Sequence, residues 1–539
     1  MKKHCNIMIQ GTGSSVGKTL IVAGLCRIFA QDGYRVSPFK SQNMALNSFV
    51  DIEGLEMSRG TVVQAEAGYE IPRAFMNPIL LKPNSDNNSQ VIINGKVAFT
   101  ADAKNYFSHS AELKQKAFES YRKYIEPNFD IAVLEGGGSP AEINLREYDL
   151  VNMGMAELVD APVILVGNID IGGVFASIYG TVMLLDENDR KRIKGYIINK
   201  FRGDADLLKP AIDILEKKFL KEGLDIKCLG VIPYADLKIE EEDSLSDQDR
   251  KIYSADKKYI NIGVIKTKKM SNFTDFYAFK QYDDVRVKYI YEAKDLEDND
   301  VIIFPGSKNT ITDLEDLKKR KIFDKVVELK EKGKIIVGIC GGLQMLGKKI
   351  FDPKQLESEI LETDGFNFFN YETTFDEIKK TEQVTKKLEN LSGILKNFNA
   401  YEVTGYEIHQ GVSTFNEPVI CNENVFATYI HGIFDNSKFT NDFLNMIRLK
   451  KSMPLKDVEI SFSEFKENEF NKLADLLRKN LDIEKIYSLI CPSPLITYFV
   501  VVNSLIPIGP RACNFCVEIP ISPPNPNSPP SENLVDAFK

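Results

Sequence analysis

Short apolar runs alternate along most of the chain with longer stretches whose apolar residues recur at helical spacing. In the first half, such runs lie at 6–10, 131–134, 163–166, 195–199 and 229–232, each followed by a polar or Gly-containing turn. Runs of this length between turn signals predict buried strands, and residues 18–31 have the pattern of a helix. This alternation is typical of a parallel α/β architecture.

A second block with the same alternation follows a polar, charged stretch at 244–258. Its predicted strands lie at 260–265, 301–304, 335–339 and 426–430, and charged helical sequence then continues to about residue 487. We therefore expect two α/β domains, at 1–243 and 259–487, with 244–258 as the linker between them.

The C-terminal stretch 488–539 has a different composition. Residues 488–510 contain no charged side chain, and ten of the chain's 23 prolines lie between Pro492 and Pro530. Cys513 and Cys516 form a single C-x-x-C pair, which is at most half of a zinc site. We expect an irregular, poorly ordered tail without a part in the chemistry.

A glycine-rich loop, "GTGSSVGKT" at 11–19, lies between the first predicted strand and the first predicted helix. The strict phosphate-loop pattern has its first glycine at position 12, so this loop is one residue longer. Backbone N–H groups of such a loop and the following helix N-terminus bind phosphate oxygens, the lysine reaches the terminal phosphates and the threonine binds Mg²⁺. The expected nucleotide-binding residues are Gly11, Thr12, Gly13, Gly17, Lys18 and Thr19.

A carboxylate follows another apolar run, in "VLEGGGSP" at 133–140. Because Mg²⁺ prefers oxygen ligands in octahedral geometry, we expect Glu135 to bind it together with Thr19, directly or through water. A plain glycine-rich turn is the alternative for this stretch. The candidate contacts to substrate or phosphate are Lys40, Gln42, Asn43 and Asp170.

A thiol stands on a tight turn in "IIVGICGGLQMLG" at 335–347, between an apolar strand and a helix. This is the nucleophile-elbow arrangement with Cys340 in place of serine, and the helix N-terminus favours the reactive thiolate. His431 follows another predicted strand and is the candidate base, while Gly306 and Gly341 are candidate oxyanion donors. Taken singly, a buried cysteine or histidine is more often structural, but the combination at three strand ends predicts catalysis.

Composition and charge narrow the classes of partner. The chain has 539 residues, 43% of them hydrophobic and 27% charged, and a formal net charge of −9, so it lacks the basic character of a nucleic-acid-binding protein. Its N-terminus runs directly into a predicted strand, and no run approaches the ~20 apolar residues of a membrane helix. We expect a cytoplasmic enzyme without nucleic-acid or membrane partners.

Eight stretches across residues 5–487 resemble the cobyric acid synthase family of glutamine-dependent amidotransferases. The first half resembles the dethiobiotin synthetase type of P-loop domain, and the second half resembles a class I glutamine amidotransferase with a flavodoxin-like sheet. The matching stretches are "KSQNMALNSFV" (40–50), "MNPILLKPNSD" (76–86), "GGGSPAEINL" (136–145), "NFTDF" (272–276), "PGSKNTITDL" (305–314), "GICGGLQMLG" (338–347), "GYEIHQG" (405–411) and "YIHGIFDN" (429–436).

This resemblance implies the following chemistry. Cys340 attacks the side-chain amide of glutamine and releases ammonia, and the thioester is hydrolysed with His431 as general acid and base. ATP with Mg²⁺ activates a corrin propionate as an acyl phosphate, and ammonia displaces the phosphate. The implied substrate is adenosylcobyrinic acid a,c-diamide, amidated at side chains b, d, e and g to give adenosylcobyric acid, along a route that excludes water.

Two departures from the family pattern stand out. Class I glutaminases often carry Glu two residues after the histidine, but Ile433 stands here, so the orienting partner of the histidine is open and a dyad is an alternative. Asn168 and Ile171 replace an acid and an arginine of the first domain. For His409, within a matching stretch, structural support is the expected role.

Three other functions remain as alternatives. The first is the sibling enzyme cobyrinic acid a,c-diamide synthase, which applies the same chemistry to other side chains. The second is a non-catalytic partitioning-type P-loop module, although its usual second lysine is replaced here by Gly13. The third is a degenerate member of the family.

Overall fold

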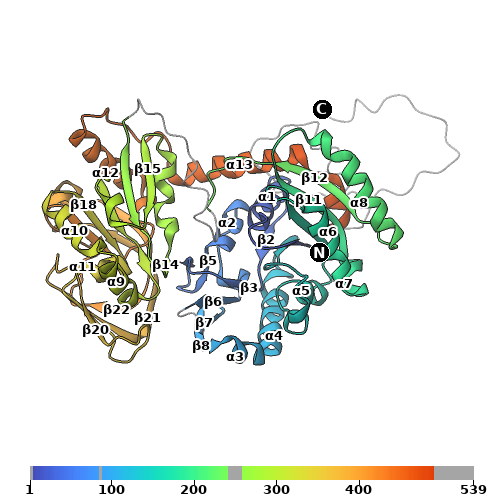
Figure 1. Ribbon diagram of the computed structural model, residues 1–539, viewed down its shortest axis with the longest axis horizontal. Coiled ribbons are helices and arrows are strands. Elements are labelled where there is room, and N and C mark those ends of the chain that lie inside the picture. Colours follow the sequence, from blue (N-terminus) through green and yellow to red (C-terminus); the bar gives the residue numbers. More distant parts are fainter. Residues whose placement is uncertain (1–3, 84–87, 241–257, 491–539) are drawn as a thin grey trace, which may run out of the picture. The chain divides into compact units, whose positions relative to one another are not determined.

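The computed structural model describes residues 4–83, 88–240 and 258–490 (Figure 1). Most of the predicted linker and the tail beyond Ile490, with Cys513 and Cys516, lie outside the described residues. Among the helices that the structure describes, none is both long enough and apolar enough to cross a membrane.

The first domain is built on a six-stranded parallel sheet with the strand order β12-β11-β10-β1-β9-β2. All five strands predicted for this block are confirmed, and the predicted helix 18–31 is α1 with the same bounds. The sheet strands are β1 (Cys5–Gly11), β2 (Val36–Phe39), β9 (Ile131–Glu135), β10 (Val163–Asn168), β11 (Ile193–Phe201) and β12 (Lys227–Pro233).

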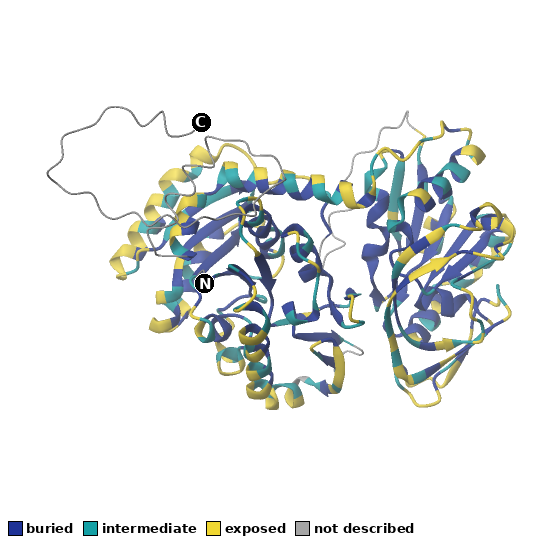
Figure 2. Ribbon diagram, turned by 180° about the vertical axis from the view of Figure 1, so that it is seen from behind, coloured by how far each residue is buried: buried dark blue, intermediate teal, exposed yellow. Residues whose placement is uncertain are grey.

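Helices accompany this sheet because parallel strands need crossover connections. Figure 2 shows buried strands in the middle of the domain and exposed residues on the outward faces of its helices. The helices are α1 (Lys18–Gln31), α2 (Arg59–Ala67), α3 (Ala103–Ser108), α4 (Ser110–Ser120), α5 (Met153–Leu158), α6 (Val174–Leu184), α7 (Glu187–Arg192) and α8 (Lys209–Lys221).

A side sheet and a small hairpin of the first domain were not predicted. The side sheet has the order β3-β6-β7-β8, and the hairpin pairs β4 with β5. Several of these strands have only three residues, too few for a visible period-two pattern. The strands are β3 (Gln42–Met44), β4 (Ser48–Val50), β5 (Glu56–Ser58), β6 (Ile79–Pro83), β7 (Asn88–Ile93) and β8 (Lys96–Asp102).

The second domain has its own six-stranded sheet, with the order β15-β13-β16-β18-β24-β23 and only the edge strand β23 antiparallel. The four predicted strands are confirmed, although the last one ends two residues earlier than expected. The strands are β13 (Ile260–Ile265), β15 (Val285–Ile290), β16 (Val301–Phe304), β18 (Ile335–Ile339), β23 (Val419–Cys421) and β24 (Val425–Thr428). Buried apolar clusters cover both of its faces.

The second sheet is flanked by helices and by further short elements that carry site residues. They are the strands β14 (Met270–Ser271) and β17 (Gly306–Ser307), the 3-10 helix η6 (Phe273–Gln281), and the helices α9 (Thr310–Lys319), α10 (Ile322–Glu331) and α11 (Gly341–Leu346).

A long antiparallel hairpin extends from the second domain. Strand β21 (Glu372–Lys387) pairs with β22 (Glu402–Ser413), and β19 (Lys349–Phe351) and β20 (Glu362–Asp364) complete this sheet. The sequence pattern did not predict the hairpin, because β21 is rich in Lys and Glu, residues that are depleted in strands.

Three C-terminal helices follow, α12 (Ser437–Lys450), α13 (Phe462–Asn480) and α14 (Ile483–Ile490), which confirms the predicted helical region. Helix α13 packs against α1 of the first domain: Arg27 of α1 forms an ion pair of 2.8 Å with Glu467, and a Cβ added at Gly24 would lie 2.3 Å from Leu477. A helix near the start of the first domain and a helix that follows the second domain therefore pack against each other. The predicted domain boundaries stay predictions.

Candidate functional sites

The phosphate loop has the predicted position between β1 and α1. Gly17 has φ of +98°, and a Cβ there would lie 2.2 Å from the side chain of Asn199, so this position requires glycine. The ammonium of Lys18 folds back over the loop and donates to the carbonyl oxygens of Gly13, at 2.9 Å, and Gly138, at 3.1 Å. These carbonyls hold the lysine at the place where phosphate oxygens are expected.

Glu135 contacts two other predicted residues, Thr19 and Lys40. It ends β9 beside β1, and its Oε1 accepts from the hydroxyl of Thr19 at 2.9 Å and from the ammonium of Lys40 at 3.2 Å. Gln64 of α2 donates to the other carboxylate oxygen. Sequence reasoning missed Gln64, since no motif contains it. The buried carboxylate next to a threonine hydroxyl offers two oxygen ligands of the type that Mg²⁺ prefers.

These groups line a large cavity of about 1420 Å³. Of the predicted residues, it is lined by Gly17, Lys18, Thr19, Lys40, Gln42, Asn43 and Glu135. Gly11, Thr12, Gly13 and Asp170 are not among the described residues that line it. Asp170 instead accepts from Nε of Arg202 at 3.2 Å, and Arg202, which sequence reasoning missed, does line the cavity.

The thiol turn has the geometry of a strained elbow. Cys340 follows β18 directly with φ of +52° and ψ of −107°, a backbone conformation that is rare for a residue with a side chain. The helix after it packs very closely, because a Cβ at Gly342 would lie 2.0 Å from the carbonyl oxygen of Phe304. The sulfur is buried and lies 3.6 Å from the carbonyl oxygen of Ile408 on β22.

His431 has a carboxylate partner that the sequence reasoning left open. Its Nδ1 lies 2.7 Å from Oδ2 of Asp275, and the other oxygen of Asp275 accepts from the backbone N–H of Gly432 at 3.0 Å. Burial lowers the pKa of His431, but the negative charge of Asp275 and the interaction with Cys340 outweigh it and raise the pKa to about 10. The buried imidazole therefore keeps its second proton at neutral pH.

Cys340 and His431 line the same small cavity, of about 30 Å³. The predicted oxyanion residues Gly306 and Gly341 are not among the described residues that line it, but both lie close to lining residues: a Cβ at Gly306 would lie 3.3 Å from Cε1 of His431, and one at Gly341 would lie 2.7 Å from the backbone nitrogen of Ser307. Glycine at both positions keeps the reacting atoms accessible. Their role as oxyanion donors stays a prediction.

His409 also lines this cavity. Its ring stacks on Tyr429 with centroids 3.8 Å apart, and its Nδ1 lies 2.8 Å from the carbonyl oxygen of Gly411. These contacts fix the position of the ring in the wall of the cavity, and its supporting role stays a prediction.

Both halves of the chain match known family models. Residues 7–245 match the CobQ/CobB/MinD/ParA nucleotide binding domain, and residues 261–439 match the CobB/CobQ-like glutamine amidotransferase domain.

Curated relatives match nearly the whole chain. A cobyric acid synthase of Clostridium botulinum (strain ATCC 19397 / Type A) is 48% identical over 505 residues, which cover 90% of this chain and 99% of the relative. The cobyric acid synthases of Caldanaerobacter subterraneus subsp. tengcongensis and Thermoanaerobacter sp. (strain X514) are each 47% identical, over 90% of this chain and 98% of each relative. With this similarity and both sites in the expected domains, the chain belongs to the cobyric acid synthase family.

Proposed function

We propose that this protein uses ATP and glutamine to amidate the b, d, e and g side-chain carboxylates of adenosylcobyrinic acid a,c-diamide, giving adenosylcobyric acid. The observation that carries the proposal is the presence, in one chain, of a phosphate loop facing a buried carboxylate and a cysteine elbow beside a histidine–aspartate pair. The first arrangement suits activation of a carboxylate, and the second suits release of ammonia from an amide.

In the first domain, the large cavity binds the nucleotide and the corrin carboxylate. Lys18 and Lys40 neutralise phosphate charge. The carbonyl oxygen of Gly13 holds the ammonium of Lys18, and the carboxylate of Glu135 holds that of Lys40, so both are in place before the phosphates bind. Thr19 and Glu135 would hold Mg²⁺, which would reduce the charge repulsion between the phosphates and the attacking carboxylate oxygen. The acyl phosphate that results is electrophilic enough for ammonia to displace the phosphate.

In the second domain, the sulfur of Cys340 attacks the side-chain amide of glutamine. The protonated ring of His431 attracts an anionic sulfur and then donates its proton to the leaving ammonia; afterwards the neutral ring activates the water that cleaves the thioester. Asp275 fixes the orientation of the ring, because it holds Nδ1 and the backbone of the next residue together.

A direct chain of contacts supports coupling between the two sites. Gln42 and Asn43 line the large cavity, and a few residues later the backbone N–H of Ser48 donates to the side chain of Asn272 at 3.0 Å. The side chain of Asn47 accepts from the N–H of Phe273 at 3.1 Å. Asn272 and Phe273 lie three and two positions before Asp275, so these two hydrogen bonds offer a route by which the first site and the histidine partner are coupled.

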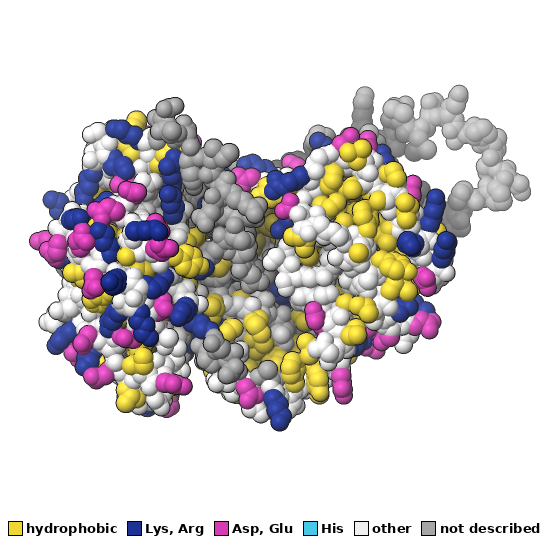
Figure 3. All heavy atoms as spheres, viewed as in Figure 1, with side chains coloured by type: hydrophobic (Ala, Val, Ile, Leu, Met, Phe, Trp, Pro, Cys, Tyr) yellow, Lys and Arg dark blue, Asp and Glu magenta, His cyan; other side chains and the backbone are white. Residues whose placement is uncertain are grey.

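Although Ile171 stands where the family has an arginine, the first site still contains a cationic side chain, that of Arg202. Ile171 is 80% exposed. Figure 3 shows that hydrophobic side chains gather on one face of the first domain. The guanidinium of Arg202 lies on Asp170 and lines the cavity, so Arg202 supplies the positive charge that position 171 lacks. This charge favours a functional enzyme over a degenerate member of the family.

The sibling reaction, catalysed by cobyrinic acid a,c-diamide synthase, is the second candidate, because both reactions use the same pair of sites. The test is mass spectrometry of adenosylcobyrinic acid a,c-diamide incubated with the protein, ATP, Mg²⁺ and glutamine. Stepwise conversion of four carboxylates to amides is the expected result. Conversion of cobyrinic acid alone would establish the sibling reaction, and no conversion beside an active family member would contradict both.

A further inference from the structure

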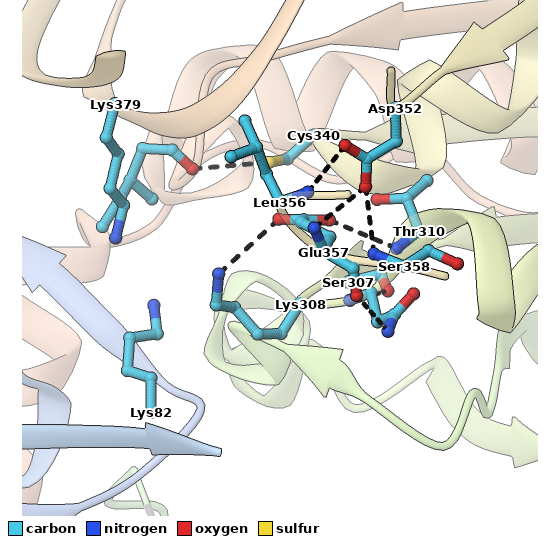
Figure 4. Close-up of polar contacts among 12 residues, drawn as sticks. Lys82, Ser307, Lys308, Thr310, Cys340, Asp352, Leu356, Glu357, Ser358 and Lys379 are labelled. Atoms are coloured by element: carbon cyan, nitrogen blue, oxygen red, sulfur yellow. Dashed lines mark hydrogen bonds and ion pairs between the residues drawn. The ribbon is translucent and has the colours of Figure 1, made fainter. Parts of the chain in front are cut away.

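A group of charged side chains lies beside the catalytic thiol and has no part in the mechanism above. Lys82, Lys308, Lys379 and Glu357 line the same cavity as Cys340 and His431. In Figure 4 the three lysines extend toward the space next to Glu357, with the sulfur above it. They come from β6, from the loop between β17 and α9, and from β21, so the tertiary fold collects them.

Glu357 is a buried carboxylate with long contacts. Its side chain is 7% exposed, its nearest cation is the ammonium of Lys308 at 3.6 Å, and the backbone N–H of Thr310 lies 3.5 Å away. Burial raises its pKa, although Lys308 opposes this. A cationic donor at a shorter distance would stabilise this buried carboxylate, because neither water nor its present neighbours solvate it fully.

The loop that carries Glu357 is held rigidly. The carboxylate of the fully buried Asp352 accepts the backbone N–H groups of Leu356, Glu357 and Ser358 at 2.8–3.0 Å. The side chain of Asn309 donates to the carbonyl oxygen of Glu357 at 2.6 Å. The carboxylate is therefore positioned by the fold and is not a surface charge that happens to fall here.

The opposite side of the cavity carries an excess of positive charge. Glu56 forms ion pairs with both Lys82 and Lys379, so one carboxylate is shared by two ammonium groups. Burial and the positive charges of Lys82 and Lys308 lower the pKa of Lys379 to about 8, although Glu56 opposes this. An anionic group entering the cavity would be stabilised by these ammonium groups.

We propose that this cluster is the binding site for the zwitterionic end of glutamine: Glu357 takes the α-ammonium, and Lys308, supported by Lys379, takes the α-carboxylate. The proposal rests on the glutamine-dependent function proposed above. The cavity of about 30 Å³ holds only a water molecule or two, so glutamine separates Lys308 from Glu357 as it enters. Glu357 then pairs with the α-ammonium in place of Lys308, and Lys308 pairs with the α-carboxylate in place of Glu357. All four charges remain paired.

This site also explains selection against other amides. An amide without the α-amino group leaves the negative charge of Glu357 without a partner in the filled site. An amide without the α-carboxylate leaves the positive charge of Lys308 without one. A buried site built for a polar group strongly rejects an analogue that lacks the group. Side-chain amides within proteins lack both charges and are excluded for the same reason.

The test compares glutamine with glutaramate, which lacks the α-amino group, and with 4-aminobutanamide, which lacks the α-carboxylate. The full-length wild type, Glu357→Gln and Lys308→Met are assayed for hydrolysis of each amide with ATP, Mg²⁺ and the corrinoid present. Glu359→Gln and Lys354→Met, two exposed positions in the same segment, are the matched controls.

For the wild type we expect a preference for glutamine over each analogue of at least about 100-fold in kcat/KM. Glu357→Gln should raise KM for glutamine and remove the preference over glutaramate, while Lys308→Met should remove the preference over 4-aminobutanamide. The controls should keep both preferences. An equal loss toward all amides, or preferences that do not change, would overturn the proposal.

A binding measurement separates this proposal from the function on which it rests. Calorimetry of glutamine with Cys340→Ala and with Cys340→Ala/Glu357→Gln needs no turnover. Weaker binding in the double variant by at least about 10-fold supports the site even if the wild type hydrolyses no glutamine. Equal binding by both variants, beside active hydrolysis by the wild type, would overturn the site and leave the function intact.

Discussion

Oδ2 of Asp275 lies 2.7 Å from Nδ1 of His431, although the two residues are 156 positions apart in the chain. Burial by itself lowers the pKa of the imidazole, but the charge of Asp275, together with the interaction with Cys340, outweighs burial and raises that pKa to about 10. The carboxylate partner of His431 therefore comes from the 3-10 helix η6, and not from the position two residues after the histidine.

Replacing Asp275 by Asn should lower the pKa of His431, because burial remains and the negative charge of Asp275 is gone. Glutamine hydrolysis should fall by up to about 10⁴-fold, as expected when a catalytic imidazole loses its orienting carboxylate. The measurement is an NMR titration of the imidazole signals, which is tractable with four histidines in the chain. An unchanged titration, as expected for the exposed control Asp298→Asn, would contradict the pairing.

The same contact sets a pH dependence of stability. Because the folded pKa of about 10 lies above the unfolded value of about 6.5, the stabilisation is complete below pH 6.5 and is lost as the pH rises through 10. The melting temperature of the wild type should therefore decrease from pH 6.5 to 10 more than that of Asp275→Asn. Parallel curves for the two proteins would show that the ring does not carry this charge.

Cys340→Ala should abolish amidation with glutamine but preserve amidation with ammonium chloride, because the phosphate loop and its carboxylate lie in the other domain. Amide products from both nitrogen sources are counted by mass spectrometry. If both activities disappear while the protein stays folded, the thiol has a structural role or the two sites are coupled more tightly than proposed.

Lys18→Ala should remove amidation with either nitrogen source, because it deletes the ammonium that two loop carbonyls hold in place for the terminal phosphates. The loss should be at least about 100-fold, the scale of one preorganised charge in a transition state. Lys221→Ala, at an exposed position of α8, is the control for a simple change of charge. Turnover retained by the Lys18 variant would argue against the phosphate-site assignment.

Glu56→Gln should destabilise the protein by about 3–5 kcal/mol, because it leaves the buried ammonium groups of Lys82 and Lys379 without their shared carboxylate. Although burial acts against them, these lysines hold the pKa of Glu56 well below its usual range, so its stabilisation is present above about pH 4.5 and is lost as the pH falls.

Thermal unfolding at neutral pH measures this effect, with Glu53→Gln in the same hairpin as the exposed control. The double variant Glu56→Gln/Lys379→Met should regain part of the loss, because it removes one of the stranded charges. A melting temperature equal to that of the wild type in the single variant would show that the bridge contributes nothing.

The sequence by itself determined the local features of both sites. The parallel strands, helix α1, the phosphate loop and the turn at Cys340 all follow from patterns within about ten residues, where glycine, apolar runs and helix starts act through neighbouring backbone. Even the contact between Thr19 and Glu135 could be predicted, because parallel strands of one sheet present their carboxyl ends at the same edge.

Only the tertiary structure decided the partners of these residues. Asp275 reaches His431, Gln64 reaches Glu135, and Glu357 reaches the thiol cavity across contacts whose sequence separation carries no periodic signal. The hairpin of β21 and β22, which forms one wall of that cavity, has strongly charged strands that resemble surface sequence. Long-range packing brings such charges together and buries them, and their pKa values and pairings follow from that burial, not from the order of residues in the chain.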